Sequence, residues 1–432
     1  MGTLTLILLI TMEAVLLFWS VRTKNNLDEE KRVIHFALLA LFILLVSTGI
    51  FEWSFRYMIL AAVLTVQAAA AGISMLRKKE KDYKTTRSVL RFVKNSVIFT
   101  LALSAAILFP QYEQPKVSGN MNIETAKYTW TDTDRVDVFS KNGENRALTV
   151  EFWYPEDKTA SYPLVIFSHG AFGFSGSNFS TFAELASNGY VVASIGHTGQ
   201  AFFTLDTEGT LTTVDSSFIS RASEINAITD TAHAEDIYRT TREWMELRTK
   251  DEDFVIDSIL EECSLNPEDP LFSIIDTEKI GLMGHSLGGA TSAQIGRERE
   301  DIDAVIVLDG TMLGEEIAFE NNTVVINDKP YPVPLLNIYA EDHYNNASEL
   351  EKDTYSNFIA SKNGICTYET VFKNAGHLNF TDLPLFSPVL AKTLGVGTVD
   401  SRYCIETMND VVLTFFNSYL KNSGVPVIEE EY

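Results

Sequence analysis

The feature of the sequence that most constrains the fold is a short apolar run followed directly by a glycine-flanked serine and a helical pattern. Residues 280–283 are apolar apart from one glycine, residues 284–288 read Gly-His-Ser-Leu-Gly, and residues 287–297 have the spacing of a helix. A Gly-x-Ser-x-Gly turn between a buried strand and a helix strains its serine, and the flanking glycines prevent clashes, so that the hydroxyl projects above the sheet. Ser286 is therefore the candidate nucleophile.

The chain from residue 134 onward alternates strand-like and helix-like patterns. Residues 134–139 and 147–154 predict an antiparallel edge. Short apolar runs at 164–167, 191–195, 280–283, 304–308 and 335–339, with a less uniform run at 367–372, predict buried strands. Helical patterns occupy 178–187, 231–248, 287–297, 347–361 and 405–421. This order predicts an α/β fold, a mostly parallel sheet covered by helices on both faces. Two long polar connections, 198–226 and 311–334, are typical of lids or binding walls.

A serine hydroxyl becomes a good nucleophile when an imidazole takes its proton and a carboxylate orients that imidazole. His377 follows the run at 367–372, where the base is expected, and it is preferred to His343, which lies in a polar segment. Two acids each follow a strand end, Asp309 after 304–308 and Asp342 after 335–339. Spacing alone leaves both open.

The run 164–167 ends in a glycine-containing turn, Ser-His-Gly-Ala-Phe-Gly, at 168–173. Such a turn exposes backbone N–H groups, so the amides of Ala171 and Leu287 are the expected oxyanion-hole donors. His169 in this turn suits a structural hydrogen bond better than the role of a base. The three cysteines lack the spacing of a zinc or redox site, so no metal or other cofactor is expected, although a Cys366–Cys404 bridge stays open.

The first 110 residues contain four apolar segments, at 3–21, 33–51, 58–76 and 92–109. Each approaches the 20 or so helical residues that span a bilayer core. We therefore expect a transmembrane region with four helices at 1–110, a linker at 111–129 and a catalytic domain at 130–432.

Charge separates the two parts and predicts their orientation. Residues 1–110 contain 13 Lys and Arg against 7 Asp and Glu, whereas residues 111–432 contain 21 against 51. The acidic part has no basic cluster for phosphates, so no nucleic-acid partner is expected. Basic residues gather at 22–32 and 77–91, which predicts that these connections are cytoplasmic. With four spans, the catalytic domain of this integral protein of the cell membrane would be extracytoplasmic.

The chain resembles the lipase-type, isoform II-like platelet-activating factor acetylhydrolases, which belong to the α/β-hydrolase superfamily together with dienelactone and polyester hydrolases. The resemblance covers about residues 130–421 and is carried by VEFWYP at 150–155, FSHG at 167–170, IGLMGHSLGG at 280–289, VLDG at 307–310 and HLNFTD at 377–382. The family's acid lies in a Leu-Asp-Gly-like setting, so the resemblance favours Asp309 over Asp342. It implies the triad Ser286, Asp309 and His377, no metal, and phospholipid substrates with short or oxidised acyl chains. The four-helix region is an addition to the family's pattern.

The sequence thus predicts a membrane-anchored serine ester hydrolase that acts through an acyl-enzyme, with a lipid or small ester as substrate and the bilayer as its other partner. Transfer of the acyl group to another alcohol, or a general or polyester esterase activity, would use the same triad. A membrane-bound binding module that has lost the reaction is a third hypothesis. The sequence leaves the oligomeric state open.

Overall fold

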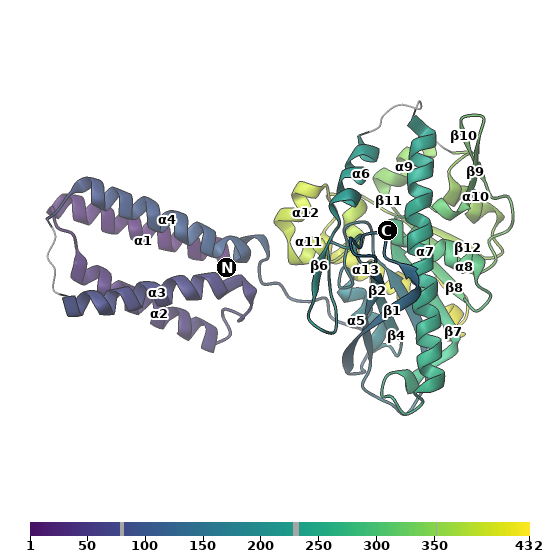
Figure 1. Cartoon of the computed structure of the whole chain (residues 1–432), viewed down its shortest axis with the longest axis horizontal. Coiled ribbons are helices and arrows are strands. Elements are labelled where there is room, and N and C mark those ends of the chain that lie inside the picture. The colour runs from purple at the N-terminus through teal and green to yellow at the C-terminus, as the bar shows by residue number, and fades with distance from the viewer. Residues whose placement is uncertain (78–81, 228–232, 351) are drawn as a thin grey trace. The chain divides into compact units, whose positions relative to one another are not determined.

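The computed structural model describes residues 1–77, 82–227, 233–350 and 352–432. The chain divides into two compact units (Figure 1). The helical unit consists of Met1–Glu113 with Pro384–Thr393, and the sheet unit consists of Gln114–Leu383 with Leu394–Tyr432. Each unit has its own apolar core.

The helical unit contains four long helices: α1 (Gly2–Thr23), α2 (Asp28–Ser47), α3 (Phe55–Arg77) and α4 (Thr85–Leu108). Its core includes Leu60, Phe99 and Leu103. Polar side chains inside the unit pair with one another, because Asn95 Nδ2 on α4 donates to Glu13 Oε1 on α1 at 2.7 Å. The buried carboxyl group therefore has a hydrogen-bond partner within the unit.

The expectation of four membrane-spanning helices is corrected to three. Among the described residues, Gly2–Thr23, Phe55–Leu76 and Thr85–Leu108 are long and apolar enough to cross a membrane. Helix α2 is not long and apolar enough to cross, because it begins with the charged run at 28–32 and ends at Ser47, before the predicted limit of 51. Its apolar part, 33–47, is roughly 22 Å long at 1.5 Å per residue, short of a hydrocarbon core of about 30 Å. Residues 78–81 of the basic connection at 77–91 lie outside the described residues.

The sheet unit is built on eight strands in the order β1-β2-β4-β3-β7-β8-β11-β12. The pairs β1/β2 and β2/β4 are antiparallel, and all the others are parallel. The strands are β1 (Ile123–Val136), β2 (Asn145–Pro155), β3 (Tyr162–Ser168), β4 (Val191–Gly196), β7 (Ile275–His285), β8 (Ala304–Leu308), β11 (Leu335–Ala340) and β12 (Thr367–Phe372). The predicted buried strands are all present, and β1 starts at Ile123, within the segment expected as a linker.

Helices cover both faces of this sheet (Figure 1). Successive side chains of β3 alternate between the faces, with Leu164 and Ile166 in one apolar cluster and Val165 and Phe167 in the other. Helices α7 (Ala234–Leu265) and α8 (Leu287–Glu298) pack on the first face, and α5 (Phe179–Ser187) and α13 (Ser401–Leu420) pack on the second. The sheet unit also contains the helices α6 (Ser216–Asn226), α9 (Glu341–Leu350) and α10 (Ser356–Asn363). Two short helices overlap the segment assigned to the helical unit: α11 (Leu383–Phe386) and α12 (Pro388–Leu394).

The long connections contain their own secondary structure. The first, 198–226, forms the hairpin β5 (Phe203–Leu205) and β6 (Leu211–Thr213) and then α6. The second, 311–334, forms the 3-10 turn η3 (Leu313–Glu315) and the hairpin β9 (Glu316–Glu320) and β10 (Thr323–Ile326). Further 3-10 turns are η2 (Phe272–Ile274) and η4 (His377–Phe380). Residues 231–232 and 351, within two predicted helices, lie outside the described residues. The three cysteines are free thiols.

The strand register brings the candidate site residues to one edge of the sheet. Ser168 pairs with Gly284, His285 with Leu308, and Leu308 with Ile338. The carboxyl ends of β3, β7, β8 and β11 therefore meet, and each is followed by one of the segments expected to carry chemistry. Ligands of open α/β sheets bind at this edge.

Candidate active site

Ser286 occupies the sharp turn between β7 and α8. Its backbone has φ 55° and ψ −124°, which is strained for a residue with a side chain. Gly284 and Gly288 make the turn possible, because a Cβ at Gly284 would overlap the backbone of Gly288, and one at Gly288 would overlap the Ser168 carbonyl. The Ser286 amide donates to Leu308 O at 2.9 Å, which fixes the turn against the end of β8.

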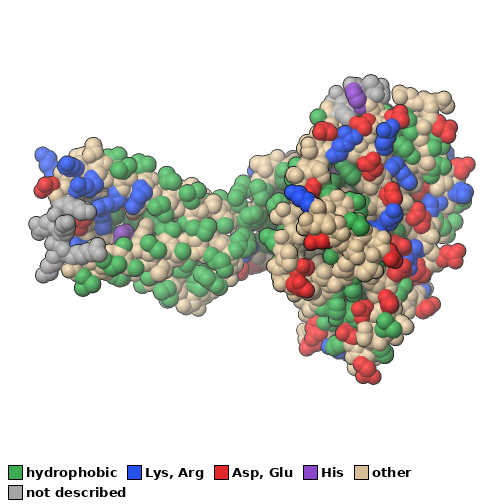
Figure 2. All heavy atoms as spheres, in the orientation of Figure 1, with side chains coloured by type: hydrophobic (Ala, Val, Ile, Leu, Met, Phe, Trp, Pro, Cys, Tyr) green, Lys and Arg blue, Asp and Glu red, His purple; other side chains and the backbone are tan. Residues whose placement is uncertain are grey.

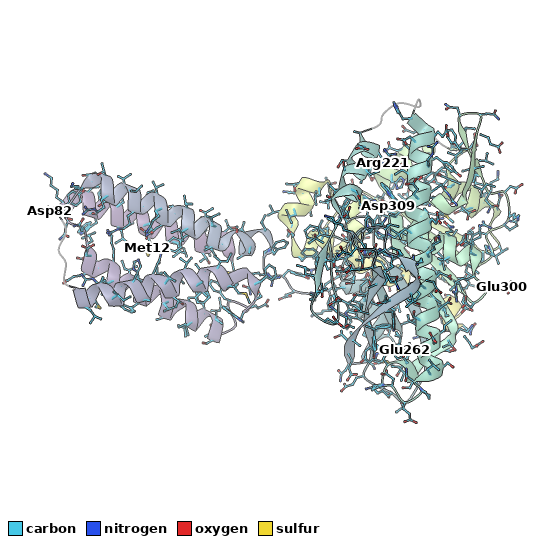
Figure 3. All side chains as sticks on the ribbon, viewed as in Figure 1. Met12, Asp82, Arg221, Glu262, Glu300 and Asp309 are labelled. Carbon is cyan, nitrogen blue, oxygen red and sulfur yellow. The ribbon has the colours of Figure 1, made fainter. Side chains whose placement is uncertain are left out.

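Asp309 and His377 lie together, as the predicted acid and base require. His377 Nδ1 is 2.7 Å from Asp309 Oδ2. A carboxylate only accepts hydrogen bonds, so Nδ1 carries the proton and Nε2 is left as the basic nitrogen. Asp309 is 1% exposed and lies in the interior of the sheet unit, whereas Glu300 lies at its edge (Figure 3).

The environment of Asp309 keeps it ionised. Burial alone would raise the pKa of this carboxyl, but hydrogen bonds from His343 and His377 outweigh burial and hold the pKa well below its usual range. The Ala340 amide also donates to Asp309 Oδ1, at 2.7 Å. An ionised carboxylate in this place can stabilise the imidazolium that forms when His377 takes a proton.

The second candidate acid, Asp342, lies apart from His377. It stands exposed in the first turn of α9, and its carboxylate accepts the backbone amide of His343 at 2.9 Å. His343 contacts the acid: its Nδ1 is 3.1 Å from Asp309 Oδ1 and its Nε2 is 3.1 Å from Tyr355 Oη. This second histidine on Asp309 was not expected from the sequence, which suggested His343 only as a weaker candidate base.

His377 lies against the turn that carries Ser286. The rings of His285 and His377 have centroids 4.6 Å apart, and His285 Nε2 donates to His377 O at 3.0 Å. Burial, reinforced by the neighbouring His377, lowers the pKa of His285 to about 3, so His285 is neutral at physiological pH. No hydrogen bond joins the Ser286 hydroxyl to His377 among the described residues, and such catalytic hydrogen bonds often tighten only when substrate binds.

The amides of Ala171 and Leu287 have the setting expected of oxyanion-hole donors. A Cβ at Gly170 would lie 3.1 Å from Ser286 Cβ, so the turn after β3 touches the nucleophile. Leu287 is the first residue of α8, where backbone N–H groups have no acceptor within the helix. In the part of the chain that the structure describes, neither amide donates to a protein acceptor.

A buried polar network lies beneath this turn, and of its members the sequence analysis anticipated only the structural hydrogen bond of His169. Arg248 and Asp251 of α7, with His169 after β3 and His197 after β4, are all fully buried. Arg248, Asp251 and His197 gave no distinct signal, because charged residues three apart in a sequence are also typical of a solvated surface. Across the described ranges, no group of three or more His, Cys, Asp and Glu side chains is arranged to hold a metal ion.

Comparisons with known proteins identify a family for this chain. Residues 147–424 match the family described as platelet-activating factor acetylhydrolase, isoform II. The chain is 26% identical over 303 residues to the platelet-activating factor acetylhydrolase of Cavia porcellus, covering 62% of this chain and 60% of that protein. It is 25% identical over 277 residues to the protein of the same name from Canis lupus familiaris, covering 60% and 57%.

A ferulic acid esterase from Streptomyces cinnamoneus shares the fold. The two structures superpose with a TM-score of 0.54 and 21% sequence identity, over 72% of this chain and 94% of the esterase. The chain spans about three fifths of the length of the two curated relatives. The family match at 147–424 includes the Ser286 turn, Asp309 and His377. With the match to its family over most of the sheet unit, this chain belongs to the platelet-activating factor acetylhydrolase isoform II family.

Proposed function

We propose that the chain is a serine hydrolase of carboxylic esters with the triad Ser286, Asp309 and His377. The observation that carries the proposal is the hydrogen bond between His377 Nδ1 and the buried Asp309, beside a serine held in a strained turn. Family membership and the names of the relatives, which are acetylhydrolases, support the same class of reaction.

The reaction follows from these positions. His377 Nε2 takes the proton of the Ser286 hydroxyl as Oγ attacks the ester carbonyl, and the Ala171 and Leu287 amides bind the resulting oxyanion. His377 then gives the proton to the leaving alcohol, which leaves an acyl group on Ser286. A water, deprotonated by His377, attacks this acyl-enzyme, and His377 returns the proton to Ser286 Oγ as the bond to the acyl group breaks and the carboxylic acid leaves. Transfer to another alcohol would differ only in the molecule that attacks the acyl-enzyme.

Apolar side chains around the oxyanion donors support an acyl ester as substrate. Ala171 and Leu287 belong to an apolar cluster that includes Trp244 of α7. The Trp244 ring is 5.1 Å from that of Phe218, which is 5.2 Å from that of Phe172. Phe172 is 40% exposed and adjoins Ala171 in the chain. A short or modified acyl chain of a phospholipid or similar lipid would bury apolar surface against these rings.

The helical unit would anchor this activity to a bilayer, with the sheet unit on the extracytoplasmic side. Figure 2 shows Lys and Arg side chains gathered at one end of the helical unit, with apolar side chains along its length. The first turn of α4, which contains Arg87, lies at this basic end (Figure 1). Basic ends of spans stay in the cytoplasm. Helix α4 starts at this end, so the chain beyond Leu108 would leave the membrane on the other side.

The test is hydrolysis by the full chain in detergent micelles. p-Nitrophenyl esters of graded chain length and phospholipids with a short sn-2 acyl chain would be the substrates, with Ser286→Ala as the inactive variant. We expect turnover in the parent chain, a loss of at least about 10³-fold in Ser286→Ala, and labelling of Ser286 by a fluorophosphonate. Ser258→Ala, which removes a hydroxyl that donates within α7, is the matched control. A parent chain that neither turns over esters nor reacts with the fluorophosphonate would favour the binding module.

A further inference from the structure

Arg248 is a buried cation beneath the turn that carries Ala171. Its guanidinium is fully buried, with Nη1 donating to His169 O at 2.8 Å and Nη2 lying 3.5 Å from Gly170 O. Its Nε donates to Gln200 Oε1 at 2.6 Å. Among the described residues Arg248 forms no ion pair with a carboxylate. A buried charge without a direct counter-ion lowers the stability of the fold. The contacts of the Arg248 guanidinium with two consecutive backbone carbonyls therefore need an explanation other than stability.

The geometry of the peptide group connects these carbonyls to the oxyanion hole. The Gly170 C=O and the Ala171 N–H belong to one planar trans peptide, so they point in opposite directions. Gly170 O accepts from His169 Nδ1 at 2.7 Å and from Gly173 N at 3.0 Å, in addition to the Arg248 guanidinium. With the carbonyl fixed by these donors, the Ala171 N–H is directed away from them. The turn touches Ser286 at Gly170, so the free amide is available beside the nucleophile.

The charge of Arg248 adds to this orientation. A cation that approaches the carbonyl end of a peptide withdraws electron density from it, and the N–H at the other end becomes a stronger donor. A fixed positive charge in a water-excluded site also favours an oxyanion that forms nearby. Both effects act in the transition state more than on a neutral ester.

A chain of hydrogen bonds connects Arg248 to a buried carboxylate. The Ser168 hydroxyl lies 3.5 Å from Arg248 Nη1 and 2.9 Å from His197 Nε2, and His197 Nδ1 lies 3.0 Å from Asp251 Oδ2. Asp251 only accepts, so the Nδ1 of neutral His197 carries its proton and Nε2 accepts from Ser168. Asp251 is itself held by Arg146 Nε at 2.8 Å and Nη2 at 2.6 Å. The network therefore fixes the side chain of Ser168 and the electrostatic environment of Arg248.

We propose that Arg248 is a positioning residue of the oxyanion hole, whose guanidinium orients and polarises the Gly170–Ala171 peptide so that the Ala171 amide stabilises the tetrahedral intermediate. This inference rests on the proposed function, because it gives Arg248 a role in that same reaction. Arg248 would act from α7, whereas the Ala171 amide lies in the turn after β3.

The test compares Arg248→Met and Arg248→Lys with the parent chain in detergent micelles. For p-nitrophenyl butyrate, Arg248→Met should lower kcat by roughly 10- to 100-fold, less than the 10²- to 10³-fold loss of an oxyanion donor, with KM within about twofold. Its inhibition constant for an alkyl trifluoromethyl ketone, which forms a tetrahedral adduct on Ser286, should rise by the same factor as kcat falls. Arg248→Lys keeps the charge but lacks the planar fork, so it should recover part of the loss.

Arg297→Met is the control for loss of a largely buried arginine, since Arg297 pairs with Glu315 at 2.6 Å on the far end of α8. It should lower Tm and leave kcat and the ketone affinity unchanged. A folded Arg248→Met with unchanged kcat, or one whose kcat falls while the ketone affinity stays, would overturn the inference and leave the proposed function intact. If both Arg248 variants fail to fold, Gln200→Ala removes the acceptor of Nε and should lower kcat in the same way. Unchanged kcat in that variant would also overturn the inference, and an inactive parent chain would overturn both proposals.

Discussion

Asp309 accepts hydrogen bonds from two histidines, and this contact separates the two candidate acids. Asp309→Asn should lower kcat by roughly 10⁴-fold, because a neutral amide can neither stabilise the imidazolium of His377 nor hold its tautomer. Asp342→Asn is the matched substitution at the exposed carboxylate that accepts the His343 amide, and it should leave kcat within about twofold. Steady-state kinetics with one p-nitrophenyl ester measure both. A larger loss in Asp342→Asn would assign the acid to Asp342, and equal losses in the two variants would contradict Asp309 as the sole acid.

At single residues, the sequence predicted the features that depend on local order along the chain. Ser286 and His377 each follow a strand end, which the sequence shows as the end of an apolar run. Asp309 and Asp342 both follow strand ends, so local order left the acid open. Contacts between distant segments could not be read from the sequence. His343 reaches Asp309 from α9, and Arg248 reaches the β3 turn from a helix 80 residues away in the chain. Such pairs depend on three-dimensional packing, and a lone charged side chain in a sequence is more often solvated.

Helix α7 shows the same limit at the scale of an element. The apolar spacing predicted a helix that ends at 248, but the helix continues to Leu265. Asp251 and Glu252 follow Arg248 on its buried face, where ordinary amphipathic patterning places apolar residues. The sheet, in contrast, was predictable, because strands buried on both faces are continuous apolar runs. In the helical unit, the apolar run 33–51 indicated a full span, and the helix end at Ser47 could not be read from it.

The buried face of α7 has a measurable effect on stability through Glu252. Burial raises the pKa of this carboxyl to about 8, although Ser292 Oγ donates to it at 3.0 Å and Arg248 lies nearby. Between the ordinary value of 4.5 and 8, the folded chain keeps a proton that the unfolded chain has lost. The stability that this group contributes is therefore complete below pH 4.5 and is lost as the pH rises through 8. Each pKa unit corresponds to about 1.4 kcal/mol.

Glu252→Gln should remove this dependence, because the amide mimics the protonated acid. The Tm of the variant minus that of the parent should increase from pH 5 to pH 8, measured by tryptophan fluorescence on the full chain in detergent. Glu246→Gln is the control on the exposed face of the same helix, where Glu246 pairs with Lys250 at 2.6 Å. The Tm of this variant minus that of the parent should stay constant from pH 5 to pH 8. A Glu252→Gln difference that is flat with pH, or that shrinks, would contradict the buried neutral carboxyl.

For the whole molecule, basic and acidic side chains are unevenly distributed along the chain, in the way expected when the basic end of the helical unit lies in the cytoplasm and the acidic sheet unit lies outside. The first 110 residues have an excess of basic side chains, placed at one end of the helical unit, and the remainder is strongly acidic. The correction from four spans to three does not change the side that we propose for the sheet unit, because the argument depends on α4 alone. That helix is itself long and apolar enough to cross, and its basic first turn favours a cytoplasmic start.

This orientation predicts which introduced cysteines a membrane-impermeant maleimide reaches in intact cells. Glu144→Cys is exposed between β1 and β2 of the sheet unit, and Thr86→Cys is exposed in the first turn of α4. Glu144→Cys should label before permeabilisation and Thr86→Cys only afterwards, each against a chain in which Cys263, Cys366 and Cys404 are replaced by serine. The reverse pattern would place the sheet unit in the cytoplasm, where its substrate would be a lipid of the inner leaflet. Labelling of both before permeabilisation would mean that α4 does not carry the chain across the bilayer.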